Sequence, residues 1–441
     1  MKLKTVLCLA LAVILLLSCF IGCADTNSTG TTAGNQPQVR NNEPVSAELL
    51  SAVTNAKPLG FTAFDSQLVE YLKQTGKADE NFTVSPLSFK AALTMAALGA
   101  EGETQVQLLA ALGFRNLEEL RAWYSTVLAG ADNFEEFYDK VENFYKNRES
   151  IYTRFSGSQA PSAEEGGDSA YRVVNSVWSN QELPGEFRQS FLDEIAKTCR
   201  AEANSVRAAE LADAVNAWVK EQTDGLIPSI LNENADSVSA ILVNALYLKT
   251  GWESGFHKLE DRDFTTVSGE TVQKPFMGQN AHFGYYADEK TQLVVVPLQG
   301  GISMVFVLGD DTNLAEKLSK AENRRVELTV PMFDVETSLS QGELVNYLRL
   351  LGCDRMFDGQ KAEFDPMYTA PLFVGDIIQK AKVHIDEDGM EAAAVTAVMT
   401  LGGGMAKPEE PVSFCADRPF TFYVLNGVET PELLFWGQIV K

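Results

Sequence analysis

The segment from Glu387 to Pro419 constrains this fold most, because it is a long connection between two predicted strands. Phe373 to Ile385 before it and Arg418 to Leu425 after it contain many Val, Ile, Phe and Tyr residues, which β-strands favour. Connections of this length are uncommon inside a compact domain, where they are usually functional or disordered. This one carries too many apolar residues for a linker, so the sequence predicts a functional loop.

The first half of this loop, Glu387 to Met399, fits two local structures. Alanine is the best helix former and Asp386 to Asp388 are acidic, as a first helical turn favours, so a surface helix is one hypothesis. The other is an extended strand that enters a sheet, because nothing in the run is large enough to block its entry. As a strand, its buriable face carries Met390, Ala392, Ala394, Thr396 and Val398, and the face near water carries Glu391, Ala393, Val395 and Ala397.

A capped helix and a fully apolar strand are predicted elsewhere. Ser85 is the expected N-cap of a helix that begins at Pro86 and ends at Gly99. The segment Val238 to Leu248 is almost continuously apolar, as expected of a strand buried on both faces, and the amide of Asn244 in its middle needs hydrogen-bond partners there. Other expected elements are a helix stopped by Gly76, a helix from Asn133 to about Phe155, a strand from Arg172 to Trp178, and a hairpin turning at 299–301.

Several stretches of the chain resemble the serpin family. They are Asn81 to Ser88, Asn244 to Phe256, the loop residues Glu387 to Val395, and the C-terminal Arg418-Pro419-Phe420 and Leu434-Phe435-Trp436-Gly437. The resemblance extends from Leu59 to Lys441. It implies an α+β serpin fold, with about nine helices around three β-sheets and a long exposed reactive-centre loop at about 387–412.

The resemblance implies a suicide-substrate inhibitor of serine proteases and of some cysteine proteases. A target protease cleaves the loop and stays attached as a covalent acyl-enzyme, while the freed hinge of the loop enters the sheet as a new central strand. The implied hinge residues are Glu387, Gly389, Met390, Glu391, Ala392, Ala393, Ala394 and Val395, with Met390 where serpins usually have Thr. The alternative is a non-inhibitory serpin-fold extracellular binding protein whose loop is cleaved as a plain substrate.

The bond that the protease cleaves has three candidates. By the family's hinge-to-bond spacing it is Gly403-Gly404, and because glycine gives a specificity pocket almost nothing to hold, the alternatives are Leu401-Gly402 and Met405-Ala406. Lys407 precedes Pro408, which is a poor context for trypsin-like cleavage. Elastase-, chymotrypsin- and subtilisin-like proteases are therefore the expected targets.

The resemblance also implies a polar cluster beneath the central sheet, called the shutter, which parts when the loop inserts. Its residues here are Ser85, Ser88, Asn244 and Gln379. Serpins usually have His in place of Gln379, so the shutter should lack a titrating imidazole. Trp252 is the implied tryptophan of the breach, the end of the sheet where the loop first inserts, although ordinary core packing is an equal alternative.

The N-terminal region predicts export. Residues 1–22 contain two lysines followed by a short apolar run and resemble a bacterial lipoprotein signal peptide, in which Cys23 is lipidated. Cys19 is a competing site, and plain secretion or a simple uncleaved anchor is the alternative. Residues 23–55 are expected to form a flexible tether, and 56–441 the serpin domain. The protein is thus expected outside the cell, in contact with a membrane only through this lipid.

Composition limits the remaining possibilities. The net charge of −24 argues against nucleic-acid binding, which needs clustered Lys and Arg. Cys199, Cys353 and Cys415 lack the spacing of a disulfide framework or of a metal site, so we expect them to be buried thiols, with one pairing left open. The sequence carries no nucleophile elbow, zinc-protease or phosphate-loop motif, so no catalytic residue, metal or cofactor is assigned. The expected partners are target proteases, bound by a monomer.

Overall fold

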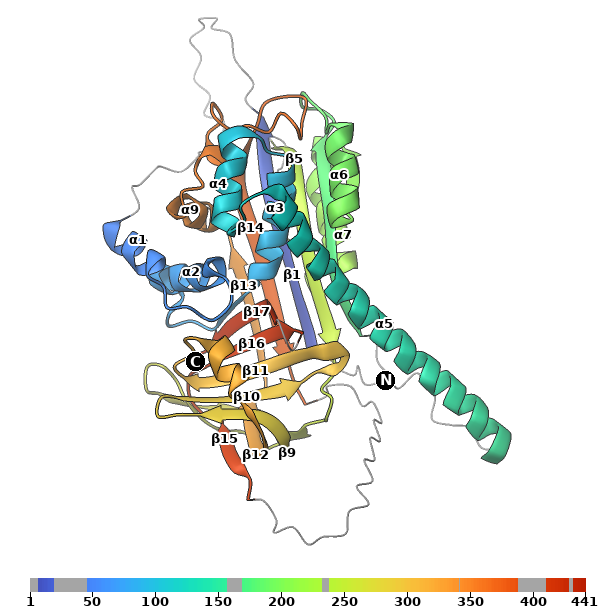
Figure 1. Ribbon diagram of the computed structural model, residues 1–441, viewed down its shortest axis with the longest axis vertical. Helices are drawn as coiled ribbons and strands as arrows, with labels where there is room; N and C mark the ends of the chain where they lie inside the picture. The colour runs from blue at the N-terminus through green and yellow to red at the C-terminus, as the bar shows by residue number, and fades with distance from the viewer. Residues whose placement is uncertain are drawn as a thin grey trace, which may run out of the picture.

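The computed structural model of this chain describes residues 7–19, 46–156, 169–231, 238–340, 342–387, 410–427 and 431–441, with the backbone alone for 7–19 and 141–156. Within these residues lie nine α-helices: α1 (Ala47–Thr54), α2 (Ala63–Leu72), α3 (Pro86–Leu98), α4 (Gly102–Leu112), α5 (Leu117–Ser156), α6 (Gln189–Cys199), α7 (Ala208–Gln222), α8 (Leu314–Ser319) and α9 (Glu343–Leu350). The strands of the same residues form three sheets (Figure 1). This confirms the expected α+β fold with about nine helices around three sheets.

The central sheet contains the strands that matter for function. In the described residues it has six strands, in the order β13 (Phe333–Leu339), β14 (Leu372–Ile385), β1 (Leu7–Cys19), β5 (Val238–Thr250), β3 (Ala170–Asn180) and β4 (Glu202–Val206). The second sheet has the order β15 (Val412–Cys415), β12 (Glu322–Pro331), β9 (Phe276–Ala287), β10 (Thr291–Pro297), β11 (Ile302–Gly309), β16 (Phe420–Asn426), β17 (Glu432–Ile439) and β2 (Phe82–Val84), with β6 (His257–Lys258) paired to β9. Strands β7 (Arg262–Thr265) and β8 (Thr271–Lys274) pair as a ribbon.

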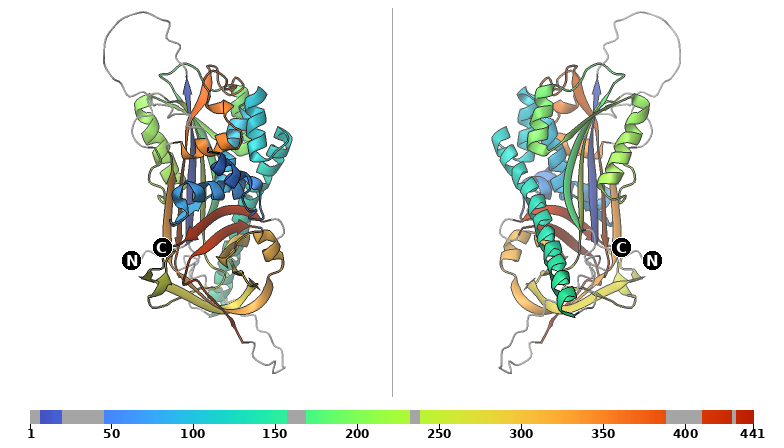
Figure 2. Two further views of the ribbon diagram at one scale, coloured as in Figure 1. Left: turned by 90° about the vertical axis from the view of Figure 1, so that its left-hand side faces the viewer. Right: turned by 90° about the vertical axis from the view of Figure 1, so that its right-hand side faces the viewer.

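Strand β5 belongs to two hydrophobic cores, as its continuous apolar sequence predicts. Leu242 and Leu246 lie in the main core, on the side of α3. The alternate residues Val243 and Tyr247 pack in a second core with α7. Figure 2 shows α3 and α7 on opposite sides of the central sheet. Because successive strand residues point to opposite faces, burial on both sides requires an apolar residue at nearly every position.

The N-terminal apolar run forms a strand of this sheet in the unprocessed chain. Strand β1 lies between β14 and β5 and runs antiparallel to both. Its pairing begins with Leu7 opposite Thr250 of β5 and ends with Cys19 opposite Leu372 of β14. Whether residues 1–22 are removed as a signal peptide stays a prediction. No helix among the described residues is long and apolar enough to cross a bilayer.

Two predicted boundaries were wrong. Helix α1 lies inside the predicted tether 23–55, because Ser46 caps the helix and Val53 is buried. The helix expected from Asn133 begins earlier and is continuous over the 40 residues of α5. It includes Gly130, whose lack of a side chain leaves room for Asn426: a Cβ there would lie 2.2 Å from the Asn426 amide nitrogen.

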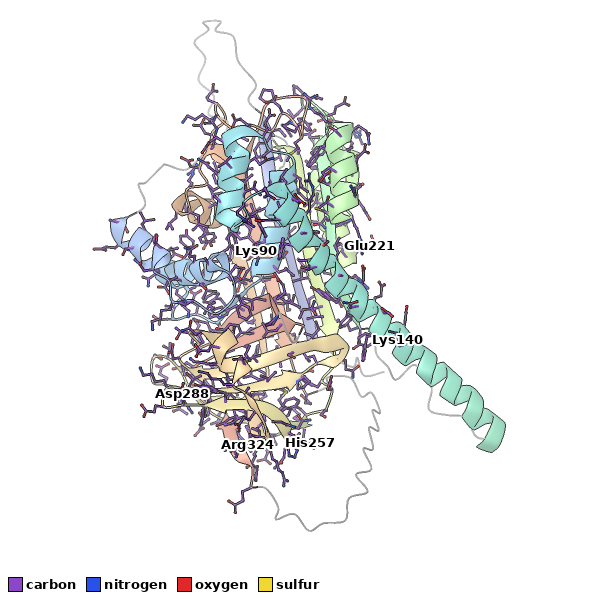
Figure 3. The ribbon with its side chains drawn as sticks, in the orientation of Figure 1. Lys90, Lys140, Glu221, His257, Asp288 and Arg324 are labelled. Atoms are coloured by element: carbon purple, nitrogen blue, oxygen red, sulfur yellow. The ribbon has the colours of Figure 1, made fainter. Side chains whose placement is uncertain are left out.

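A buried ion pair fixes α3 behind the sheet. The Lys90 ammonium lies 3.2 Å from a carboxylate oxygen of Asp65 on α2 and 3.6 Å from one of Glu432 on β17. Figure 3 shows Lys90 among these packed elements. Burial alone would lower the pKa of Lys90, but the two carboxylates outweigh it and raise this pKa. A charged amine is therefore maintained in the core, and it orients the helix that carries Ser85 and Ser88.

Candidate functional site

The site is the place in the central sheet between β14 and β5, which we call the central position. In the described residues, β5 and β14 each pair with β1, which occupies the central position, and not with each other. Strand β14 ends at Ile385, just before the predicted loop, and the chain resumes at Glu410 ahead of β15. A segment that follows β14 directly and pairs with it must turn back antiparallel to it, which is the direction of β1.

The structure brings the four predicted shutter residues together below the central position. The Ser85 hydroxyl accepts a hydrogen bond from the Ser88 amide at 3.1 Å, and the Ser88 hydroxyl donates to the Asn244 side-chain oxygen. The Gln379 amide donates to the Ser85 carbonyl oxygen at 3.3 Å. All four residues are buried. The cluster thus links α3 to both strands that flank the central position, and its role as a shutter stays a prediction.

The pairing register places the shutter opposite one residue of the inserted strand. Val13 is the partner of Asn244 on β5 and of Gln379 on β14. The side-chain oxygen of Gln379 is buried and has no hydrogen-bond partner among the described atoms. A buried amide oxygen without a donor costs about 1–3 kcal/mol. A hydroxyl in the strand at this point would remove that cost.

The partners that complete the shutter were not predicted from the sequence. The Asn244 amide donates to the Asn175 side-chain oxygen at 2.9 Å, and the Asn175 amide donates to the Tyr124 hydroxyl at 2.8 Å. The Asn175 amide also donates to the Cys199 carbonyl oxygen at 2.7 Å. The available signal in the sequence was the polar pair Asn175-Ser176 between the apolar residues of the predicted strand Arg172 to Trp178. Burial raises the pKa of the Tyr124 hydroxyl well above its usual range, so it stays neutral.

Trp252 lies at the end of the sheet where the loop begins. Its ring nitrogen donates to the carbonyl oxygen of Asp386 at 3.1 Å, and the ring packs against Phe256. The indole is buried, as expected for core packing, but the hydrogen bond to Asp386 also fixes the first residue after β14. Both hypotheses for Trp252 are therefore compatible with its contacts.

A second polar network lies at the breach end of the central sheet, and the sequence did not predict it. The Tyr138 hydroxyl of α5 lies 3.1 Å from the Thr250 hydroxyl and donates to the Gln299 side-chain oxygen at 3.1 Å. The Gln299 amide reaches the Trp252 carbonyl oxygen at 3.4 Å. Gln299 begins the turn predicted between β10 and β11, which is confirmed. This network ties helix α5 to the breach.

Charged side chains surround the last residues of β14. His384 Nε2 lies 3.2 Å from the Asp386 carboxylate, and His384 Nδ1 lies 3.6 Å from Asp334 on β13, which also pairs with Lys382. The hydrogen bond to Asp386 raises the pKa of His384, although partial burial and Lys382 oppose this. Glu387 lies 3.6 Å from the Lys258 ammonium. The site therefore contains a titratable imidazole, at the breach rather than at Gln379.

The surroundings of the central position differ little between its two faces. In the register of β1, every second residue is opposite Tyr247, Ala245 or Val243, and these pack in the core with α7. A strand in the central position therefore has apolar neighbours on this face too, and which face of the loop strand lies near water stays a prediction. Of the hinge, only Glu387 falls within the described residues. Outside them lie Gly389, Met390, Glu391, Ala392, Ala393, Ala394, Val395, the bond candidates Leu401, Gly402, Gly403, Gly404, Met405 and Ala406, and Cys23.

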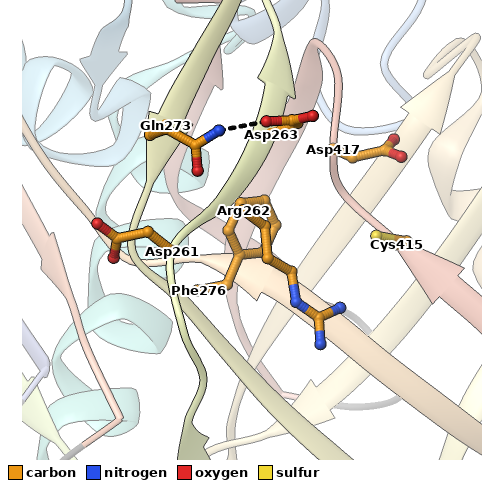
Figure 4. Close-up of a pocket in the computed structure, with 7 residues that line it drawn as sticks. All are labelled: Asp261, Arg262, Asp263, Gln273, Phe276, Cys415 and Asp417. Carbon is orange, nitrogen blue, oxygen red and sulfur yellow. Dashed lines mark hydrogen bonds between the residues drawn. The ribbon is translucent and has the colours of Figure 1, made fainter.

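The cysteines and a surface pocket lie away from the central position. Cys199, Cys353 and Cys415 are free thiols, the first two buried and the third half-buried. Cys415 lines a pocket of about 460 Å³ at the ribbon of β7 and β8 (Figure 4). Its other lining residues are Asp261, Arg262, Asp263, Gln273, Phe276 and Asp417. The described residues contain no cluster of His, Cys, Asp and Glu that could hold a metal ion.

The fold and the site together define a class of protein: one whose central sheet accepts a strand above a buried polar cluster, next to the start of a long loop. Comparisons with known proteins agree. The family described as Serpin (serine protease inhibitor) matches residues 61–441. The chain belongs to the serpin family, whose members are protease inhibitors and not enzymes.

Individual relatives are distant in sequence but matched over most of their length. Macrophage plasminogen activator inhibitor 2 of Mus musculus is 28% identical over 410 residues, covering 83% of this chain and 95% of the relative. Leukocyte elastase inhibitor of Equus caballus is 30% identical over 389 residues, covering 81% and 92%. The solved structure of a thyroxine-binding globulin complex with thyroxine, 21% identical, has a TM-score of 0.64 and covers 89% of this chain and 99% of that one. At that identity the structural likeness shows the fold alone.

Proposed function

We propose that this protein is a suicide-substrate inhibitor of serine proteases, with elastase-, chymotrypsin- and subtilisin-like enzymes as targets and some cysteine proteases as further ones. The protease serine attacks the carbonyl carbon of the cleaved bond, and the C–N bond breaks. The new amino group stays on the downstream segment, which leads into β15. The loop upstream of the cut then remains joined to the protease through an ester. Entry of that loop into the central sheet carries the protease with it.

The observation that carries this proposal is the central position itself. It is paired over the 13 residues of β1, it begins beside Trp252 where the loop starts, and it runs in the direction that the loop must take. A strand of that length measures about 43 Å at roughly 3.3 Å per residue. Insertion therefore moves an attached protease across the whole sheet. Loss of even one oxyanion-hole donor slows acyl transfer about 100 to 1000-fold, so distortion of the captured active site is enough to stop hydrolysis.

The register supports the Gly403-Gly404 bond. If Met390 takes the place of Leu7, a strand of the same 13 residues ends at Gly402, one residue before that bond. In this register Thr396 takes the place of Val13, between Asn244 and Gln379. Its hydroxyl is then the donor that the buried Gln379 oxygen lacks. Leu401-Gly402 and Met405-Ala406 remain as alternative bonds.

Incubation with a protease panel tests the proposal. The chain without residues 1–22 is mixed with pancreatic and neutrophil elastases, chymotrypsin, subtilisin and trypsin, and run on an SDS gel. We expect an SDS-stable complex with at least one of the first four, and mass spectrometry of the released C-terminal fragment identifies the bond. A single cut after Lys407 would refute the proposed target preference. Cleavage by all of these enzymes with no complex would refute inhibition.

The second candidate is a non-inhibitory extracellular binding protein, because thyroxine-binding globulin shares this fold. Such a protein is cut in the loop without trapping a protease. A large gain in heat stability after cleavage would argue against it, because that gain reports insertion of the loop.

The same proposal includes export from a bacterial cell and attachment of the mature N-terminus by a lipid on Cys23, with Cys19 as the alternative. Mass spectrometry of the mature N-terminal peptide tests this. A diacylglycerol-modified cysteine supports the anchor, and an unmodified mature N-terminus would replace it with plain secretion. The protein is then a monomer that meets its proteases outside the cell.

A further inference from the structure

The N-terminal segment occupies the place that the proposed mechanism requires to be open. Leu7 pairs with Thr250 at the breach, and the pairing continues to Ser18 opposite Val238 at the far end of β5. On the other side, pairing with β14 runs from Cys8 opposite His384 to Cys19 opposite Leu372. Strand β1 therefore covers the breach, the shutter and the far end of the sheet in one continuous strand.

We propose that residues Leu7–Cys19 and the reactive-centre loop compete for the central position, so that the chain traps a protease only after its N-terminal segment has been removed. This inference rests on the proposed function. The two segments exclude each other, because two strands cannot both form backbone hydrogen bonds with the same edges of β5 and β14. Each backbone N–H and C=O on those edges has one place in the ladder, and β1 holds it.

The two competitors are both parts of the same chain, and this decides which one is favoured in the unprocessed protein. The uncut loop is joined to β14 at one end and to β15 at the other, so it extends fully into the sheet only if β15 separates from β12. The segment Leu7–Cys19 precedes every other described element and is joined to them through residues 20–45, so no two strands of the sheets hold it between them. It therefore enters without any cleavage. Its apolar composition suits a strand with a core on each face, as β5 has.

Occupancy by β1 changes the outcome of a cut in the loop. The freed loop finds the central position filled and must wait for β1 to leave. Displacement breaks backbone hydrogen bonds along both edges, each of about 1 kcal/mol net, so it is slow compared with insertion into an open position. The acyl-enzyme then hydrolyses first, and the inhibitor behaves as a plain substrate. Removal of residues 1–22, which we propose to occur on export, opens the central position and activates the inhibitor outside the cell that makes it.

Four proteins made by cell-free translation, which retains the N-terminal segment, test the inference: the full chain, the chain without residues 1–22, the full chain with Leu11→Pro, and the full chain with Thr31→Pro. Proline lacks the N–H that a central strand needs, so Leu11→Pro removes β1 from the sheet. Thr31→Pro is the matched control in the predicted tether. Each is incubated with the protease that forms a complex with the shortened chain.

The expected result is an SDS-stable complex with the shortened chain and with Leu11→Pro. The full chain and Thr31→Pro should give at least about tenfold less complex and more cleaved, released inhibitor, because the competent state is populated only in a small fraction of molecules. Equal complex yields from the full and shortened chains would overturn the inference and leave the proposed function intact. Failure of the shortened chain to trap any protease would instead overturn the proposed function.

A second measurement does not depend on inhibition. In hydrogen exchange, the peptide spanning 7–19 should exchange slowly in the full chain and in Thr31→Pro, where both of its edges are paired, and fast in Leu11→Pro. Exchange at the same rate in all of these proteins would show that β1 does not hold the central position, whatever the protein does to proteases.

Discussion

Substitution of Ala394 by Arg tests loop insertion at a single point. In the proposed register Ala394 takes the place of Leu11, whose partners are Leu246 on β5 and Ala381 on β14. Both partners are fully buried. An arginine placed between them is an unpaired charge in an apolar core, which costs several kcal/mol. If about 3 kcal/mol of that cost appears in the barrier to insertion, insertion slows by about 100-fold, since each 1.4 kcal/mol is a factor of ten.

Trapping competes with hydrolysis of the acyl-enzyme, so a hundredfold slower insertion lowers the ratio of trapped to hydrolysed molecules by about 100-fold. The assay is the stoichiometry of inhibition together with the SDS-stable band, measured on the chain without residues 1–22. Glu410→Arg is the control, because it places the same side chain on an exposed residue near the end of the loop, downstream of every candidate bond. Cleavage should continue in both variants. An unchanged yield of complex from Ala394→Arg would refute the reasoning, since the register would then not bury this residue.

The remaining predictions concern stability. Because the pKa of His384 is raised by Asp386, protonation stabilises the fold, and this contribution is complete below the ordinary histidine value of 6.5 and is lost as pH rises through the raised value. The urea midpoint of the native chain should therefore fall over that interval, and His384→Gln should flatten the fall; an identical slope would contradict this assignment. Asn244→Ala leaves the Ser88 hydroxyl and the Asn175 oxygen without partners and should lower the free energy of unfolding by about 2–4 kcal/mol, measured by urea unfolding. The exposed Asn323→Ala should change it by less than about 0.5 kcal/mol, and equal effects of the two would contradict the role of the cluster.

Local sequence patterns were sufficient to predict the elements whose burial or boundaries follow directly from the order of apolar and polar residues. The apolar run Val238 to Leu248 predicted a strand with two covered faces, and the Ser85-Pro86 pair predicted the start of α3. Both signals are patterns of residues adjacent in the sequence, so they can be recognised without the fold. The polar cluster was found because Asn244 is an amide in an apolar strand. Its partner Asn175 was missed, since only the pairing of β3 with β5 brings the two together.

Other features depend on contacts that are distant in sequence. His384 was not a candidate because its partner Asp334 meets it only when β13 pairs with β14. Nothing in the apolar run Leu7–Cys19 distinguishes a leader from a buried strand, since both require the same composition. The start of α5 was missed because the packing of Gly130 against Asn426 is invisible in the sequence.

Helix α7 has a consequence for how a protein like this changes its target. The helix packs on β3, β4 and β5, on the face of the central sheet opposite α3, so a strand that enters beside β5 has apolar neighbours on both faces. In the proposed mechanism, residues from Met390 to Val398 must then stay narrow whichever enzyme is attacked, whereas those from Leu401 to Ala406 are free to vary. The residues that select the protease and the residues that enter the sheet would therefore be adjacent but separate. Substitutions in the first segment could change the target without impairing insertion of the second.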